Sequence, residues 1–419
     1  MTEAMAQRKN IYSFLKDRGF VYQTTDDSAV ERLLNDEKAV FYLGIDPTAD
    51  SLHIGHFFAL RVFRFLQEAG HQGILLIGGA TSRIGDPSGK SDMRKMLDQS
   101  TISENLESIR NLVRNFIIVD GDNAAIFHSN AEWMSGYDYV DFLRDVGVHF
   151  NVNSMLQADA YKNRIKEGGL TFLEMGYMLM QAYDFVHLKR EHGCRLQIGG
   201  SDQWGNIVAG TALNRKMFGI KSESDEIYGL TNPLLLTKDG RKMGKTEKGT
   251  LWVVGDRTPA FDFYQYFYNI EDESVDMLLR LFTEIDLKEI SDLCRNDILK
   301  AKRRMAYEIT ALVHGAEQAK KTEEAAISLF SDKTRALADA PSCSVVIPDA
   351  SLSIIDLMAD IRFVPSKSEA RRLIQQGAVS IDDVKVDSID FALDPADMRK
   401  KGSILIKRGK KNFIKVNFT

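Results

Sequence analysis

The feature that most constrains the fold is a strand, a helix and a second strand in close succession near the start of the chain. Residues 39–46 (AVFYLGID) and 73–80 (GILLIGGA) are short apolar runs, and residues 57–70 between them have apolar side chains at helical spacing. Strands joined by one helix in this way lie parallel, with a right-handed crossover. Further strands are predicted over residues 115–121, 124–129 and 195–200. We therefore expect an open, mostly parallel α/β sheet with ligands bound beyond the carboxyl ends of its strands.

The chain is long enough for more than one domain. Its 419 residues exceed the roughly 250–300 residues at which a single core stops growing. Residues 259–332 have a mostly helical pattern, and the stretch that follows is mixed and contains two prolines. We predict an α/β domain, a lysine-rich loop with a helical domain, a linker, and a small α+β domain. Their predicted bounds are residues 1–230, 231–332, 333–350 and 351–419.

The last predicted domain has its own electrostatic character. Ser366 and Glu369 form an S-x-x-E capping box for a helix, and two hairpins follow, one turning at residues 382–383 and one at Gly409. The whole chain has a net charge of −5, yet residues 351–419 contain 13 Lys/Arg against 9 Asp/Glu. Because the last 22 residues have eight basic and no acidic side chains, we expect this end to contact RNA.

Composition excludes several classes of protein. Hydrophobic residues make up 44% and charged residues 27%, which are proportions of a folded globular chain. The apolar runs are far shorter than the roughly 18 residues that suggest a membrane span, and the first residues lack an apolar signal segment. Cys194, Cys294 and Cys343 are scattered singly, so they predict neither a disulfide framework nor a zinc cluster. A reducing cytoplasm is the expected location.

The strongest local motif is His53-Ile54-Gly55-His56, directly between the first strand and its helix. A helix N-terminus offers unpaired N–H groups and a positive dipole to phosphate. Two imidazoles at this point can donate to phosphate or ribose oxygens, and Gly55 allows a ligand to approach the backbone closely. The alternative is a pair of histidines that only cap the helix or pack locally.

A second candidate motif is the sequence LTKDGRKMGKT at residues 236–246. Lys242, Lys245 and Thr246 lie in a loop that also contains glycines and further basic residues. Because a lysine is a flexible point charge, such a loop suits a mobile clamp that closes on a polyphosphate. The alternative is an ordinary charged turn exposed to solvent.

These two motifs together resemble the class I aminoacyl-tRNA synthetases, which have a Rossmann-like fold. More specifically, the chain is similar to the bacterial tyrosyl-tRNA synthetase family over essentially its whole length. The similar segments are residues 42–56, 78–89, 177–185, 196–206 and 242–246. The lysine motif departs from the class consensus at Gly244 and Thr246, as the tyrosyl branch does. Only Met243 differs from that branch, which has phenylalanine there.

The resemblance implies activation of L-tyrosine with ATP, followed by transfer to tRNA(Tyr). It gives catalytic roles on phosphate, ribose and pyrophosphate to Thr48, His53, His56, Lys242, Lys245 and Thr246. It places in the ATP and adenylate site Gly44, Asp46, Gly55, Gly200, Asp202 and Gln203. It places in the tyrosine pocket Tyr42, Asp86, Tyr177, Gln181, Asp184 and Gln197. Spacing supports part of this set, because Tyr177, Gln181 and Asp184 share one face of a helix.

The resemblance also implies partners. The helical domain is expected to bind the anticodon, and the terminal domain resembles the RNA-binding domain of a primary-binding ribosomal protein of the small subunit. Its expected tRNA contacts are Arg371, Arg372, Lys407, Arg408, Lys410 and Lys411. A homodimer is expected, with Phe172 and residues 142–150 near the interface. No tightly bound cofactor is expected, and Mg²⁺ is expected to arrive with ATP.

Three rival interpretations fit the sequence less well. A P-loop at residues 85–91 (GDPSGKS) is rejected, because the first glycine of that motif would fall at Ile84. A tryptophanyl-tRNA synthetase or another HxGH nucleotidyltransferase is disfavoured by Tyr42, Asp184 and the basic terminal domain. A non-catalytic RNA-binding or splicing protein on the same scaffold needs neither the histidine pair nor the lysine pair. The presence of both pairs therefore disfavours this interpretation.

Overall fold

A computed structural model describes residues 10–88, 97–246, 249–331, 341–382, 384–409 and 412–419. The chain forms two compact units, Met1–Gly315 and Ala316–Thr419. Among the described residues, no helix is both long enough and apolar enough to cross a membrane.

The first unit is built on a six-stranded sheet with the order β1-β6-β5-β2-β3-β4. The strands are β1 (Gln23–Thr24), β2 (Val40–Ile45), β3 (Gln72–Ile77), β4 (Ile126–Ser129), β5 (Leu196–Gly200) and β6 (Tyr228–Asn232). All neighbouring pairs are parallel except β1 with β6 at the edge. The predicted open α/β sheet is therefore confirmed, and its strand order reverses at β2, between β5 and β3.

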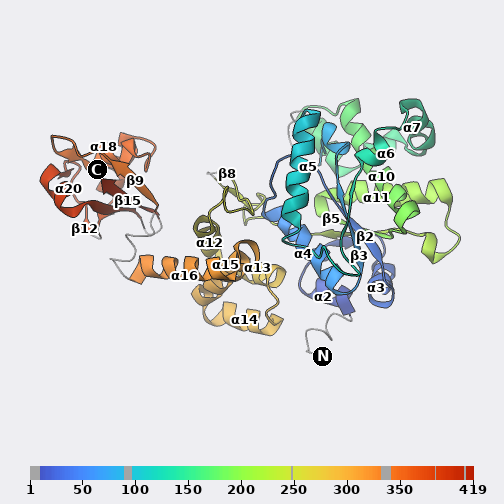
Figure 1. Cartoon of the computed structure of the whole chain (residues 1–419), viewed down its shortest axis with the longest axis horizontal. Coiled ribbons are helices and arrows are strands. Elements are labelled where there is room, and N and C mark those ends of the chain that lie inside the picture. The colour runs from blue at the N-terminus through green and yellow to red at the C-terminus, as the bar shows by residue number, and fades with distance from the viewer. Residues whose placement is uncertain (1–9, 89–96, 247–248, 332–340, 383, 410–411) are drawn as a thin grey trace. The chain divides into compact units, whose positions relative to one another are not determined.

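Helices cover both faces of this sheet. Helices α4 and α5 lie on one side, and α10 and α11 lie on the other (Figure 1). Strand β3 is almost wholly buried, which explains its continuous apolar run. The helices of this part are α2 (Ile11–Asp17), α3 (Asp27–Asp36), α4 (Ile54–Glu68), α5 (Gln99–Val113), α6 (Ala131–Met134), α7 (Tyr139–Asp145), α8 (Val152–Met155), α9 (Asp159–Glu167), α10 (Phe172–His192) and α11 (Trp204–Phe218).

One predicted strand is wrong. Residues 115–121 form no strand, although the run contains Ile117, which is buried. The side chain of Gln67, itself buried on α4, accepts a hydrogen bond from the Ile118 N–H and donates one to the Ile118 carbonyl, both at 2.9 Å. The Gln67 amide thus makes the backbone hydrogen bonds that a neighbouring strand would otherwise make, and the apolar run forms a loop.

The predicted helical segment follows the sheet within the same unit. Its helices are α12 (Ala260–Tyr268), α13 (Val275–Phe282), α14 (Leu287–Asn296) and α15 (Ile298–His314). Phe282 of α13 packs against Phe57 and Phe58 of α4, with ring centroids 5.9 and 5.8 Å away. The helix that begins at the histidine motif therefore contacts the helical segment near its own N-terminus.

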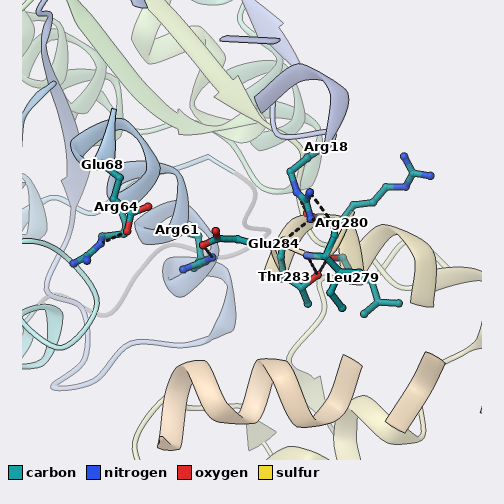
Figure 2. Close-up of polar contacts among 9 residues, drawn as sticks. Arg18, Arg61, Arg64, Glu68, Leu279, Arg280, Thr283 and Glu284 are labelled. Atoms are coloured by element: carbon teal, nitrogen blue, oxygen red, sulfur yellow. Dashed lines mark hydrogen bonds and ion pairs between the residues drawn. The ribbon is translucent and has the colours of Figure 1, made fainter. Parts of the chain in front are cut away.

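Arg18 makes a further contact between the sheet domain and the helical segment (Figure 2). Its guanidinium donates to the carbonyls of Arg280, Thr283 and Ile285 around the C-terminus of α13. A cation at a helix C-terminus is favourable, and burial lowers the pKa of this guanidinium below its usual value. Arg61 of α4 also lies 4.0 Å from Glu284.

The second unit begins with α16 (Ala316–Ser331), so its boundary precedes that helix, whereas the predicted boundary followed it. A five-stranded sheet has the order β12-β11-β14-β15-β9. Its strands are β9 (Ser342–Val345), β11 (Val379–Ile381), β12 (Val384–Lys385), β14 (Ser403–Arg408) and β15 (Asn412–Phe418). The other elements are β10 (Leu352–Ser353), β13 (Ala392–Leu393), α18 (Ile354–Asp360), α19 (Lys367–Gln375) and α20 (Pro395–Lys401).

This unit confirms both predicted hairpins and corrects the predicted linker. Strand β11 pairs with β12, and β14 pairs with β15 across Gly409, whose φ of +65° suits a tight turn. The Ser366 hydroxyl accepts the Glu369 N–H at 3.2 Å, which is one half of the predicted capping box, while the Glu369 carboxylate pairs with Arg372. However, β9 lies inside residues 333–350 and pairs in parallel with β15. The described end of the predicted linker therefore belongs to the terminal domain.

Candidate active site

A cavity of about 460 Å³ opens at the carboxyl ends of β2 and β5. This is the point where the strand order reverses, at which open α/β sheets bind ligands. The predicted site residues that line it are Tyr42, Gly44, Asp46, Thr48, His53, Gly55, His56, Asp86, Tyr177, Gln181, Asp184, Gln197, Gly200, Asp202, Gln203, Lys242 and Lys245. The side chain of Thr246 lies outside the described part of the chain.

The two histidines of the first motif cap α4 and line the cavity at once. His53 Nδ1 accepts the N–H groups of Gly55 and His56 at 3.1 and 3.4 Å, and His56 Nδ1 accepts the His53 N–H at 3.4 Å. The rings stack with centroids 3.8 Å apart. Because each Nδ1 acts as an acceptor, the proton of each neutral ring is on Nε2. Both rings can therefore offer an Nε2–H donor to a ligand.

Asp46, at the end of β2, is held by hydrogen bonds from two elements. Its carboxylate accepts from the Tyr177 hydroxyl at 2.9 Å and from the Thr81 hydroxyl at 2.8 Å. Asp86 is held similarly, by the Gln203 amide at 2.7 Å and the Ser88 N–H at 2.9 Å. These carboxylates keep fixed positions around the cavity before a ligand arrives.

Asp184 of α10 is a deeply buried carboxylate in the cavity wall, only 2% exposed. It accepts from the Trp133 indole at 2.8 Å and from the Asn130 amide at 3.0 Å. Burial nevertheless raises its pKa to about 7. Sequence reasoning missed Asn130 and Trp133, although both follow strand β4, whose carboxyl end meets the same edge of the sheet.

Beside Asp184 the cavity wall holds polar atoms that have no partner among the described residues. These atoms are the Tyr42 hydroxyl, Gln181 Oε1 and Gln197 Oε1. Burial raises the pKa of Tyr42 well above its usual value, so its hydroxyl keeps its proton. Buried polar groups are normally paired, so a polar ligand is the expected partner of this set.

The lysine loop packs directly against the histidine motif. Gly244 has φ of +82°, and a Cβ there would lie 2.6 Å from Ile54 Cγ2. The Ile54 N–H donates to the Leu251 carbonyl at 3.3 Å, and the Lys242 ammonium lies 2.9 Å from Asp202 in the cavity wall. Two motifs nearly 190 residues apart in sequence therefore form one wall.

The predicted RNA contacts lie in the second unit. Arg371 and Arg372 are exposed on α19, and Arg372 forks onto Glu369 at 2.9 and 2.6 Å. Lys407 and Arg408 end β14. The bond from Arg372, and the charge of Arg408, lower the pKa of Glu369. Lys410 and Lys411 lie outside the described residues.

Family models match both parts of the chain. The model described as tRNA synthetases class I (W and Y) covers residues 34–331, and that of the tyrosine–tRNA ligase SYY-like C-terminal domain covers residues 332–416. The tyrosine–tRNA ligase of Clostridium tetani is 45% identical over 97% of this chain and 98% of its own length. That of Caldanaerobacter subterraneus subsp. tengcongensis is also 45% identical, over 96% and 98%.

Solved structures agree with these matches. A C-terminally truncated mitochondrial tyrosyl-tRNA synthetase of Aspergillus nidulans has a TM-score of 0.67 at 27% identity, covering 79% of this chain and 100% of that one. The fold and family predicted from the sequence are confirmed, and the rival assignments are not needed. The chain belongs to the class I tRNA synthetases of the W and Y family and, within it, to the tyrosine–tRNA ligases.

Proposed function

We propose that this tyrosine–tRNA ligase forms tyrosyl-adenylate in the cavity at the carboxyl ends of β2 and β5. The observation that carries this proposal is the meeting of the histidine motif, the lysine loop and the Asp184 wall around one cavity. Amino-acid-dependent ATP–pyrophosphate exchange, measured with each of the twenty amino acids, tests it. Exchange with tyrosine alone is expected, and exchange with tryptophan or with none would contradict the proposal.

In the activation step the tyrosine carboxylate attacks the α-phosphorus of ATP, and pyrophosphate leaves. His53, from its Nε2–H, and Thr48, from its hydroxyl, would donate hydrogen bonds to the reacting phosphates, and His56 would donate one from its Nε2–H to the ribose. Lys242 and Lys245 would neutralise charge on the departing pyrophosphate, and the Thr246 hydroxyl would donate a hydrogen bond to it, with Mg²⁺ arriving on ATP. Such chemistry needs positioning and charge stabilisation, and no covalent nucleophile from the protein.

The tyrosine side chain would lie against Tyr42 and Asp184. A phenol hydroxyl there can donate to the Asp184 carboxylate and pair with the Tyr42 hydroxyl, which lacks a partner in the described residues. Phenylalanine would leave the Tyr42 hydroxyl buried without a partner and would give Asp184 no hydrogen bond beyond those from Asn130 and Trp133, which is costly. Selectivity for tyrosine would therefore come from the hydrogen bonds that its phenol hydroxyl makes with Tyr42 and Asp184 in the cavity wall.

Replacing Tyr42 with phenylalanine is expected to lower the preference for tyrosine over phenylalanine. In this variant phenylalanine leaves one fewer buried polar group unpaired. The difference is worth about 1–3 kcal/mol, or about fivefold to 150-fold in the ratio of kcat/KM. Pyrophosphate exchange with each amino acid measures the ratio. Tyr161→Phe is the control, because that buried hydroxyl donates to the Met175 carbonyl and does not line the cavity. An unchanged ratio in Tyr42→Phe would remove Tyr42 from the pocket.

In the transfer step the terminal ribose hydroxyl of tRNA(Tyr) attacks the acyl carbon of the adenylate. The exposed arginines of α19 and the basic end of β14 supply the positive charge that the tRNA backbone requires. We place the helical segment at the anticodon, as the resemblance implies. The compartment that we propose is the cytoplasm, where the three cysteines remain reduced thiols.

A homodimer is the expected assembly, and exposed apolar side chains at two of the expected interface positions support it. Phe172 is 74% exposed at the start of α10, and Val148 is 70% exposed in the segment expected at the interface. Exposed apolar side chains gathered in one region mark interaction sites. Sedimentation should show a dimer for the unmodified chain and for Leu299→Asp, a control at an exposed α15 position, but monomers for Phe172→Asp. A monomeric, fully active unmodified chain would contradict the assembly.

A further inference from the structure

Tyr266 joins the helical segment to the lysine loop through one hydrogen bond. Its side chain projects from α12, and its hydroxyl accepts the Gly244 N–H at 2.8 Å. Burial raises the pKa of this hydroxyl, so it stays neutral at physiological pH. The ring packs edge-on against Phe267, which is itself fully buried, with centroids 5.1 Å apart. The acceptor is therefore held by the core of the helical segment.

A hydrogen bond to the Gly244 backbone acts on the loop directly between its two candidate phosphate-binding lysines. Gly244 stands between Lys242 and Lys245, in a backbone conformation that L side chains rarely adopt. Its carbonyl accepts the Leu251 N–H at 2.7 Å, and its Cα side faces Ile54 of the histidine motif. Gly244 is thus held by Leu251, by the histidine motif and by Tyr266. Only the last of these three contacts comes from the helical segment.

We propose that Tyr266 is a positioning residue for the lysines that bind the ATP phosphates. It orients the Gly244 peptide, and through it the backbone of Lys245 and Lys242, while its hydroxyl touches no substrate. This inference rests on the proposed role of the two lysines. It also makes the helical segment, which we expect to bind the anticodon, part of the support of the phosphate site.

A second contact between the lysine loop and the helical segment is expected to contribute much less to activity. Lys238 of the loop pairs with Glu273, just after α12, at 2.5 Å. Both side chains are more than 60% exposed, and exposed ion pairs of this kind contribute little. Glu273→Gln is therefore expected to change activity by less than about twofold. The half-buried Tyr266 contact differs because its loss leaves a backbone N–H without its partner.

The test compares Tyr266→Phe with Tyr268→Phe in the full-length chain. Both changes remove one hydroxyl from α12, but the Tyr268 hydroxyl forms no hydrogen bond within the described part of the chain, and its ring stacks on Tyr264. Pre-steady-state adenylate formation is followed at varied ATP and at varied tyrosine. In Tyr266→Phe we expect the rate constant or the apparent ATP affinity to fall about threefold to tenfold, the effect of one hydrogen bond. Tyrosine affinity should match that of Tyr268→Phe and the unmodified chain, and Tm should fall by no more than about 2–4 °C.

The outcomes separate this proposal from the function on which it rests. If the unmodified chain shows no tyrosine-dependent exchange, the function assignment fails. If it is active and Tyr266→Phe has unchanged ATP dependence, only the positioning role is overturned. A Tyr266→Phe chain that loses tyrosine affinity equally, or melts more than about 5 °C lower, would show a purely structural role, since one hydrogen bond of about 1 kcal/mol shifts Tm by only about 2–4 °C in a large domain. That result would overturn the proposal too.

Discussion

Replacing His53 with alanine is expected to lower the rate of tyrosyl-adenylate formation by about 10²-fold or more. Removing one preorganised donor to charge that develops in a transition state costs about 10²–10³ in rate. Tyrosine affinity should change by less than about twofold, because the interaction is made with the reacting phosphates and not with the amino acid. Rapid-quench measurement of adenylate formation, with separate titration of tyrosine, distinguishes the two quantities. Thr48→Ala and Lys245→Ala should act in the same direction.

The structure provides a control for this change, because His53 is also the N-cap of α4. Alanine removes the cap, which destabilises a helix by about 0.5–2 kcal/mol, whereas serine retains a capping oxygen. We therefore expect His53→Ser to recover thermal stability relative to His53→Ala but not to recover the rate. Recovery of the rate by serine would mean that His53 acts only as a cap, and the phosphate assignment would be wrong.

Removing residues 341–419 is expected to preserve tyrosine-dependent pyrophosphate exchange and to lower tRNA charging by about 10²-fold or more. Every residue assigned to ATP and tyrosine lies in the first unit, while loss of several backbone-phosphate contacts weakens tRNA binding by orders of magnitude. The cut precedes β9 because a cut at residue 351 would leave that strand without its partner β15. Charging by the full-length chain should also weaken as salt rises.

Exchange by the truncated chain is the internal control for this experiment. If exchange and charging fall together, the terminal unit supports the catalytic fold. If neither falls, the unit is not the tRNA anchor. Substitution of both Arg371 and Arg408 by glutamine in the full-length chain should lower charging without changing exchange, and should reduce the salt dependence.

The fold was predictable where local pattern decides it. Strands β2, β3 and β5 are buried on both faces, so their apolar runs are continuous and easily recognised. The run at residues 115–121 has the same character but is paired by the Gln67 side chain, a partner about 50 residues away that no local pattern reveals. Strand β9 lies within the predicted linker for a similar reason, because its pairing partner β15 lies about 70 residues later in the chain.

The candidate site, like the fold, could be predicted from the sequence only in part. The histidine and lysine motifs are short, and their chemistry is legible from residue type and spacing. The partners of Asp184 are different, because Asn130 and Trp133 reach it from the end of another strand. Likewise, the dual role of His53 as cap and donor follows only from the hydrogen bonds of its Nδ1 atom. Sequence predicted the candidate reacting groups, and structure identified the residues that hydrogen-bond to them.

The most direct test of the central claim is a crystal structure of the chain with a non-hydrolysable tyrosyl-adenylate analogue. We predict that the phenol oxygen lies within hydrogen-bond distance of Tyr42 and Asp184, and that the phosphate analogue lies within reach of His53 Nε2 beside the lysine loop. Crystals in which the phenol lies elsewhere, or in which the analogue lies outside the cavity at the ends of β2 and β5, would contradict the account.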